Sequence, residues 1–154
     1  MNGSLRNLSY KYIRDGFDED GEMIPDIPIV YLSLESKYGR ATGPAIIDTG
    51  FDGGIYSNLQ VIRILEGLEP IRIKRIENPL YEPVICEIFR VQGFLIKPTT
   101  KQVISLGSVN VYVPTEPDFI GDEVLVGREL INNLELKLDG KKVSIKLSEN
   151  LEER

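Results

Sequence analysis

One aspartate in this sequence follows directly on an apolar run and is the residue best placed for chemistry. Residues 46–50 read Ile-Ile-Asp-Thr-Gly, so Asp48 stands at the end of a predicted strand. The apolar residues anchor such a strand in a core, and Gly50, which has no Cβ, lets another backbone or a substrate come close. A carboxylate held at a defined point can act in acid–base catalysis. In the simpler alternative, Asp48 caps backbone amides where the strand turns.

The composition removes most other kinds of catalytic chemistry. The chain has no histidine and a single cysteine, Cys86, which lies in an apolar run. Ser-His-Asp triads, Cys-His dyads and His-ligated zinc are therefore impossible, and a transition-metal site would need mostly carboxylate ligands. We expect no cofactor and no metal. We also expect Cys86 to be a small core residue rather than a reactive thiol.

Charge and hydropathy argue against two classes of partner. The formal net charge is −6, whereas a nucleic-acid-binding protein needs basic surface to replace the counterions of phosphates. No apolar run is long enough to span a bilayer, and the first residues contain no apolar signal region. We therefore expect a cytoplasmic protein that binds neither nucleic acid nor a membrane.

Alternating and apolar runs separated by turn residues predict many short strands. We expect residues 8–14 and 27–34 to pair as a hairpin around an acidic loop. The other strands are expected at 40–47, 55–56, 71–76, 84–96, 102–113 and 123–127, followed by a closing hairpin of 134–138 and 143–147. This pattern predicts an all-β barrel or sandwich.

At most two short helices are expected between these strands. Ser57 or Asn58 can cap a helix over residues 59–65, which Gly67 would end, and residues 128–134 have room for one or two turns. The 154 residues fit one compact domain.

Three features together resemble the retropepsin-like aspartic peptidases of clan AA. The first is the Asp-Thr-Gly run at 46–50. The second is Val-Leu-Val-Gly-Arg-Glu-Leu-Ile at 124–131, which is similar to the apolar-apolar-Gly segment and short helix near the C-terminus of that family. The third is the hairpin that follows. The form Asp-Thr-Gly-Phe-x-Gly-Gly at 48–54 resembles a small prokaryotic branch of the clan.

The resemblance implies a fold and a domain organisation. The fold would be all-β, a retropepsin-like closed β-barrel with one or two short helices, and it would cover residues 25–147. Residues 1–24 would then form an N-terminal hairpin or arm, and residues 148–154 a frayed tail.

The resemblance also implies a hydrolytic mechanism. In this family two Asp carboxylates share one proton, the ionised one activates water, and the protonated one donates to the scissile carbonyl. Because this chain has one Asp-Thr-Gly, the pair would come from a C2 homodimer with the catalytic Asp48 of each copy at the axis. The expected function is thus a homodimeric aspartic endopeptidase, a protease acting on peptides or unfolded proteins. Thr49 and Gly50 would support the active-site loop, Thr49 through a hydrogen bond to backbone across the symmetric partner.

Three further residues are candidates for substrate binding: Phe51, Gly53 and Tyr81. Phe51 either walls a substrate pocket or fills core. Tyr81 lies in the loop 77–83, where viral members carry a glycine-rich lid, although this loop has two prolines and no glycine. It either reaches toward substrate or is an ordinary exposed aromatic residue. Asp52 is expected to face water.

Two other functions fit the same residues. One is a non-catalytic dimeric module for binding or assembly that keeps the peptidase fold. The other is an unrelated small β-barrel that binds a ligand, with Asp48 capping a turn.

Overall fold

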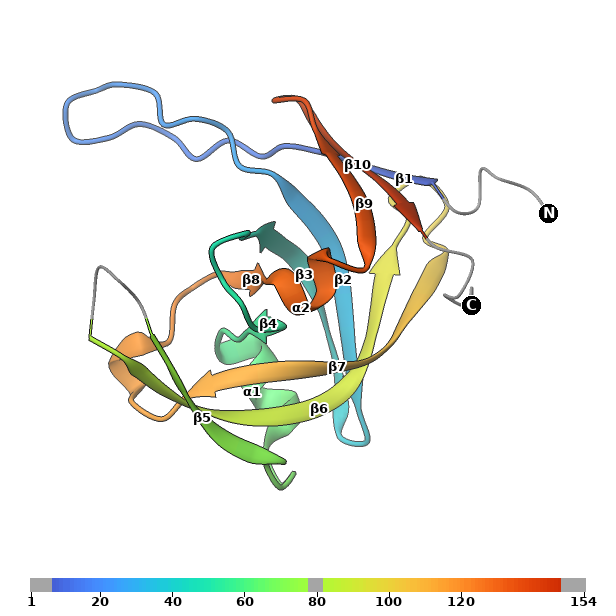
Figure 1. Ribbon diagram of the computed structural model, residues 1–154. Helices are drawn as coiled ribbons and strands as arrows, with labels where there is room; N and C mark the ends of the chain where they lie inside the picture. Colours follow the sequence, from blue (N-terminus) through green and yellow to red (C-terminus); the bar gives the residue numbers. More distant parts are fainter. Residues whose placement is uncertain (1–6, 78–81, 148–154) are drawn as a thin grey trace.

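The computed structural model describes residues 7–77 and 82–147, and β-strands are its main elements (Figure 1). The strands are β1 (Asn7–Lys11), β2 (Ile29–Ser36), β3 (Gly39–Ile47), β4 (Ile55–Tyr56), β5 (Arg72–Ile76), β6 (Val84–Ile96), β7 (Val103–Pro114), β8 (Val124–Val126), β9 (Leu134–Leu138) and β10 (Lys142–Leu147). The helical segments are α1 (Leu59–Leu65), the 3-10 turn η2 (Pro117–Phe119) and α2 (Arg128–Ile131). In the described part of the chain, no helix is long and apolar enough to cross a membrane.

The larger sheet closes on itself. Strands β2, β3, β8, β4, β7 and β6 lie side by side in this order, and β6 also pairs with β2, which completes a barrel. Strand β5 pairs with the first part of β6 outside this ring. Buried apolar side chains such as Val30, Leu32, Ile55, Val91 and Val111 fill the interior. The prediction of an all-β closed barrel with short helices is confirmed.

Strand β8 has an unusual place in the barrel, because it lies between two strands that are close in sequence. It runs parallel to β3, with Val126 opposite Ile47, and antiparallel to β4, with Val126 opposite Ile55. The chain that leaves β3 must therefore cross the end of β8 before it returns as β4. Residues 48–54 make this crossing, so β8 supports the loop that carries Asp48.

Helix α1 follows the predicted signals. Asn58 is its N-cap residue, and its side chain accepts a hydrogen bond from Val61 N at 3.0 Å. Val61, Ile64 and Leu65 are buried and join the barrel core, and the helix packs against β2 and β3. Gly67 then turns the chain away with a φ of +88°, a value that favours glycine.

The predicted hairpin of residues 8–14 and 27–34 forms only in part: among the described residues, one bridge between Ile13 and Ile27 joins the two ranges around the acidic loop. Strand β1 pairs antiparallel with β10, whereas β2 pairs with β3 and β6. The reason is packing: Leu8 and Tyr10 are 3% and 1% exposed, and they lie opposite Ile145 and Val143 on the closing hairpin. Tyr10 also donates a hydrogen bond from its hydroxyl to Ile96 O at 2.8 Å. The closing hairpin of β9 and β10 is confirmed.

The segment between β1 and β2, residues 12–28, is called the 12–28 arm below. It projects from the barrel as an extended double strand (Figure 1, upper left). Among the described residues, isolated bridges join its two limbs at Ile13 and Ile27 and at Phe17 and Met23.

Candidate active site

Asp48 lies at the first position of the loop that crosses β8, and its backbone is tied to that strand. Its N–H donates to Val126 O at 2.9 Å, and its carbonyl accepts from Phe51 N at 3.2 Å. The carboxylate is half-buried, and its Oδ1 accepts a hydrogen bond from Gly50 N at 3.0 Å. Asp48 therefore does cap a turn. A carboxylate has two oxygens and accepts several hydrogen bonds, so this cap is compatible with a chemical role.

The second segment singled out by sequence, residues 124–131, contacts the same loop. Backbone N–H groups at the start of α2 donate to the loop: Gly127 N to Gly54 O at 2.7 Å, Arg128 N to Phe51 O at 2.8 Å and Glu129 N to Gly53 O at 3.1 Å. The first N–H groups of a helix lack partners within the helix, and here the loop carbonyls satisfy them. The loop that carries Asp48 is thus fixed by β8 on one side and by α2 on the other.

This close approach requires glycine at position 127. A Cβ there would lie 2.6 Å from Phe51 O and in direct collision with Gly53 O. Gly127→Ala is expected to lower the free energy of unfolding by about 2–3 kcal/mol, because the loop and α2 must separate to admit a methyl group. Urea denaturation measures the change. Gly43→Ala in β3 is the matched control, since a Cβ there meets nothing within 4 Å; equal losses in the two variants would contradict the explanation.

Phe51 anchors the loop from beneath. It is 7% exposed and makes edge-to-face contacts with Tyr56 and Tyr112, at centroid distances of 5.9 and 5.3 Å. With Cys86, Ile88 and Tyr112 it forms a second, smaller core. Phe51 also lines the pocket described below. The two roles left open by the sequence, core residue and pocket wall, are therefore combined in one side chain.

Burial changes the acidity of several groups in and near this core. Cys86 is a core residue, as expected, and burial raises the pKa of its thiol to about 11. Burial raises the pKa of Tyr56 to about 12, and the nearby Cys86 adds to the shift. The pKa of Tyr112 is likewise raised to about 12, mainly by burial and further by the Glu129 carboxylate. Among the described residues, the buried Tyr112 hydroxyl has no hydrogen-bond partner.

These shifts predict how stability depends on alkaline pH. The unfolded chain loses its thiol proton from a pKa of 9.0 and its tyrosine protons from 10.0, whereas the folded chain keeps them to about 11 and 12. Protons bound more tightly by the folded state stabilise it at lower pH, so the free energy of unfolding should fall steadily as pH rises above 9. Urea denaturation below pH 9 and near pH 11 measures this. A Cys86→Ala variant should show a shallower fall between these values, and an unchanged slope would contradict the role of the thiol.

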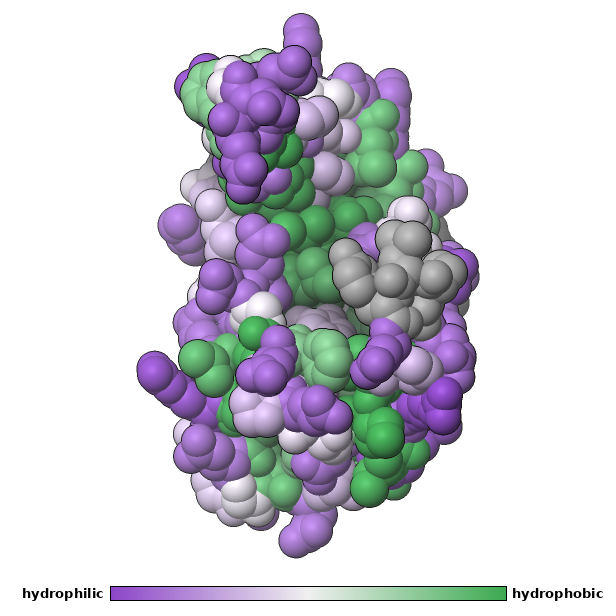
Figure 2. All heavy atoms as spheres, turned by 90° about the vertical axis from the view of Figure 1, so that its left-hand side faces the viewer, coloured by the Kyte–Doolittle hydropathy of each residue, from purple (hydrophilic) through white to green (hydrophobic). Residues whose placement is uncertain are grey.

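A pocket of about 840 Å³ opens beside the loop. Asp48 lines it, together with residues of the turn around η2 and of the β5–β6 hairpin, where Ile76 pairs with Val84. Figure 2 looks onto this side of the molecule, where apolar surface gathers in a hollow below the 12–28 arm. The lining side chains are mostly apolar, with charged groups among them: Asp48, Gly50, Phe51, Asp52, Tyr56, Ile76, Glu77, Val84, Asp118, Phe119, Ile120, Gly121, Leu125 and Arg128.

The structure divides the sequence candidates that it describes into three groups. Asp48, Gly50 and Phe51 line the pocket, and Asp52 lines it while remaining exposed, as expected. Thr49 is exposed on the loop. Gly53 is not at the pocket surface but buried, since a Cβ there would lie 2.5 Å from Phe51 Cζ, so its role is to admit the Phe51 ring. Tyr81 lies outside the described residues.

Sequence reasoning missed the contribution of the η2 turn. Phe119 and Ile120 line the pocket, and the Tyr56 hydroxyl donates to Phe119 O at 2.7 Å, which ties the turn to β4. The sequence did hold a signal: an aromatic and a branched residue stand next to each other in a loop that begins with Pro117. Among the described residues, no three His, Cys, Asp or Glu side chains gather in a way that could hold a metal ion.

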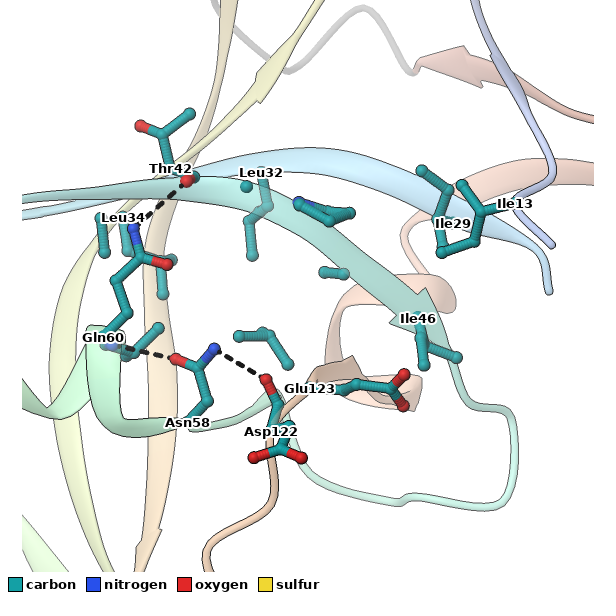
Figure 3. A pocket seen from close by; sticks show the side chains of 16 residues that line it. Ile13, Ile29, Leu32, Leu34, Thr42, Ile46, Asn58, Gln60, Asp122 and Glu123 are labelled. Atoms are coloured by element: carbon teal, nitrogen blue, oxygen red, sulfur yellow. Dashed lines mark hydrogen bonds between the residues drawn. The ribbon is translucent and has the colours of Figure 1, made fainter. Parts of the chain in front are cut away.

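A second, smaller hollow of about 260 Å³ lies between β3, the start of α1 and the residues that lead into β8 (Figure 3). Its amide side chains are bound to backbone: Gln60 donates to Thr42 O at 3.4 Å and Asn58 donates to Asp122 O at 3.2 Å. Asp48 is not among its described lining residues. These contacts hold α1 against the barrel, so we regard this hollow as structural.

Comparisons by sequence find no relative of this chain, whereas comparison by structure finds a similar fold. No protein-family model matches the chain. No curated protein matches it either. Among solved structures, the crystal structure of a retropepsin-like aspartic protease from Rickettsia conorii is similar, with a TM-score of 0.51 and 12% identity over 96% of each chain. The chain therefore has a retropepsin-like all-β fold.

Proposed function

We propose that this protein is a homodimeric aspartic endopeptidase. The observation that carries the proposal is the position of Asp48. It is half-buried at the start of a loop that β8 and α2 hold by backbone hydrogen bonds, and it lines the 840 Å³ pocket. A rigid backbone around an acid is what catalysis requires, because a misplaced group loses much of its effect. The retropepsin-like fold agrees with this reading.

The proposal requires a second copy of the chain. Two carboxylates that share one proton must lie about 3 Å apart in equivalent settings. A C2 dimer provides this by placing one Asp48 from each chain next to the other at the axis. One feature supports such an interface: Thr49 and Gly50 are exposed on the loop that carries Asp48.

The chemistry then follows from the shared proton. The ionised carboxylate of the pair takes a proton from water as the water oxygen attacks the scissile carbonyl carbon. The protonated carboxylate donates to the carbonyl oxygen, and a tetrahedral intermediate forms without a covalent bond to the protein. Its collapse breaks the C–N bond as the leaving nitrogen takes up a proton from the pair, and a hydroxyl of the intermediate returns a proton to the pair as the new carboxyl group forms. The two aspartates titrate as a unit, so neither pKa belongs to one chain.

The pocket suggests which side chains a substrate would bring. Phe51, Tyr56 and Leu125 offer apolar and aromatic surface close to Asp48. A peptide lying across the loop could bury a large apolar side chain there, at a gain of about 1.5–3 kcal/mol. We therefore propose peptides and unfolded proteins with large apolar residues near the cleaved bond as substrates.

The test is whether the activity per chain depends on chain concentration, as it must if only the dimer cleaves. At mildly acidic pH, the specific activity on an unfolded protein should rise with chain concentration and level off where sedimentation detects the dimer. Activity that is constant from monomeric to dimeric conditions would contradict a shared site. A chain that dimerises but cleaves none of a varied set of unfolded proteins would leave the non-catalytic binding module as the function.

A further inference from the structure

The 12–28 arm is an ordered hairpin with no place in the barrel. Its tip turn is held by Asp18, whose Oδ1 accepts hydrogen bonds from Asp20 N and Glu22 N, both at 2.9 Å. Across the arm, Ile24 N donates to Gly16 O at 2.8 Å. It projects on the side of the molecule where the loop of Asp48 lies (Figure 1). The arm is thus built as a defined structure, although it adds little to the core of its own chain.

The tip of the arm exposes two large apolar side chains. Phe17 is 67% and Met23 62% exposed, and they stand opposite each other at a bridge. A pair of this kind on a projecting hairpin marks an interaction site more than a scattered surface residue does. The same tip is strongly acidic: residues 15–26 hold six acids, and Lys and Arg are absent from residues 15–36. The surface that binds the tip should therefore be apolar and basic.

The β9–β10 hairpin has this complementary character. Leu138 is 46% exposed near its turn, and the strands and turn carry Lys137, Lys141 and Lys142. Lys11 on β1 lies opposite Lys142 and adds to the positive charge. Leu138 and the three lysines around it, which outnumber the single acid Asp139 of the turn, match the apolar pair among acids on the arm.

The tip and the hairpin of one chain are kept apart by the path of the arm. The base of the arm lies beside the hairpin turn, since Tyr12 N donates to Lys141 O at 2.9 Å and the Tyr12 hydroxyl accepts from Gly140 N at 3.3 Å. From there the arm leads away, and the five residues to Phe17 span about 16 Å in extended form. Figure 1 shows the tip far from β9 and β10 of its own chain. The matching surface is therefore offered to another molecule.

We propose that the tip of the 12–28 arm binds the β9–β10 hairpin of a second copy of this chain. This inference rests on the proposed function, which requires such a copy on the side where the arm projects. Two-fold symmetry makes the contact reciprocal, so that each arm reaches the hairpin of the other chain. Phe17 and Met23 would pack against Leu138, and Glu19 and Asp20 would face Lys137 and Lys141.

The apolar contact is tested by sedimentation equilibrium on a Phe17→Ser/Met23→Ser variant. Its dimer dissociation constant should rise about tenfold or more, because two apolar side chains lose their contact with the partner. Leu59→Ser is the matched control, since Leu59 is 62% exposed on α1, and it should leave the constant unchanged. The arm variant should keep the wild-type kcat once concentration restores the dimer.

The charge pairing is tested by exchange. A Glu19→Lys/Asp20→Lys chain and a Lys137→Glu/Lys141→Glu chain should each dimerise weakly alone, because like charges meet in both contacts. Mixed in equal amounts, they should form a heterodimer as tight as the wild type, since both contacts then pair opposite charges. If the wild type dimerises and both charge variants dimerise equally well alone, the arm contact is overturned and the peptidase proposal stays intact. A chain that is monomeric at all concentrations would contradict both.

Discussion

Replacing Asp48 by Asn is expected to lower kcat/KM for an unfolded protein substrate by about 10³-fold or more, because an amide can neither share the proton nor accept one from water. The substitution keeps the shape of the side chain, and its remaining carbonyl oxygen can still accept the hydrogen bond from Gly50 N. The fold should therefore survive, and the Tm should stay close to that of the wild type. Glu66→Gln, at the exposed end of α1, is the control for removing one carboxylate and should retain activity.

Mixing wild-type and Asp48→Asn chains tests specifically whether two chains share one site. With a tenfold excess of the Asp48→Asn chain, most wild-type chains pair with an inactive partner, and activity per wild-type chain should fall to about one tenth. The control is the same excess of Glu66→Gln, which should not inhibit. Undiminished activity in the first mixture would mean that one chain holds a complete site.

Replacing Phe51 by Ala is expected to lower the free energy of unfolding by about 3–5 kcal/mol, the usual loss for a buried aromatic residue. Phe51 is 7% exposed and loses edge-to-face contacts with both Tyr56 and Tyr112. The substitution also removes the aromatic ring against which Gly53 packs. The loop of Asp48 should therefore loosen, and activity should fall even where the chain remains folded.

Urea denaturation at fixed chain concentration measures the loss, since the proposed dimerisation would itself stabilise the folded state. Leu59→Ala is the control, because this exposed residue should change stability by no more than about 0.5 kcal/mol. A loss below about 1 kcal/mol for Phe51→Ala would show that the second core does not support the loop.

The sequence allowed prediction of the parts of the site that depend on neighbours along the chain. The apolar run before Asp48 predicts β3, Asn58 predicts the start of α1, and alternation around the turn at Asp139 predicts the β9–β10 hairpin. In each case short-range hydrogen bonding or alternation decides the structure. These are the features that the structure confirms.

The parts of the structure that depend on contacts between distant residues could not be predicted from the sequence. Alternation at Leu8 and Tyr10 predicts a strand, but its partner is chosen by the apolar surface of β10, more than a hundred residues later. The burial of Gly53 and the pocket wall at Phe119 likewise follow from packing between segments far apart in sequence. Tertiary contacts select such partners, and a single sequence does not reveal them.

The insertion of β8 between β3 and β4 has a consequence for how the protein folds. Ile47 and Val126 are paired neighbours although about 80 residues separate them, and such long-range contacts form late because the chain between them must first be ordered. During synthesis, the loop of Asp48 would leave the ribosome long before the strand and helix that fix it. In a newly made chain, the loop of Asp48 would thus stay unordered until β8 and α2 have been synthesised. Any cleavage would be delayed until the barrel is complete.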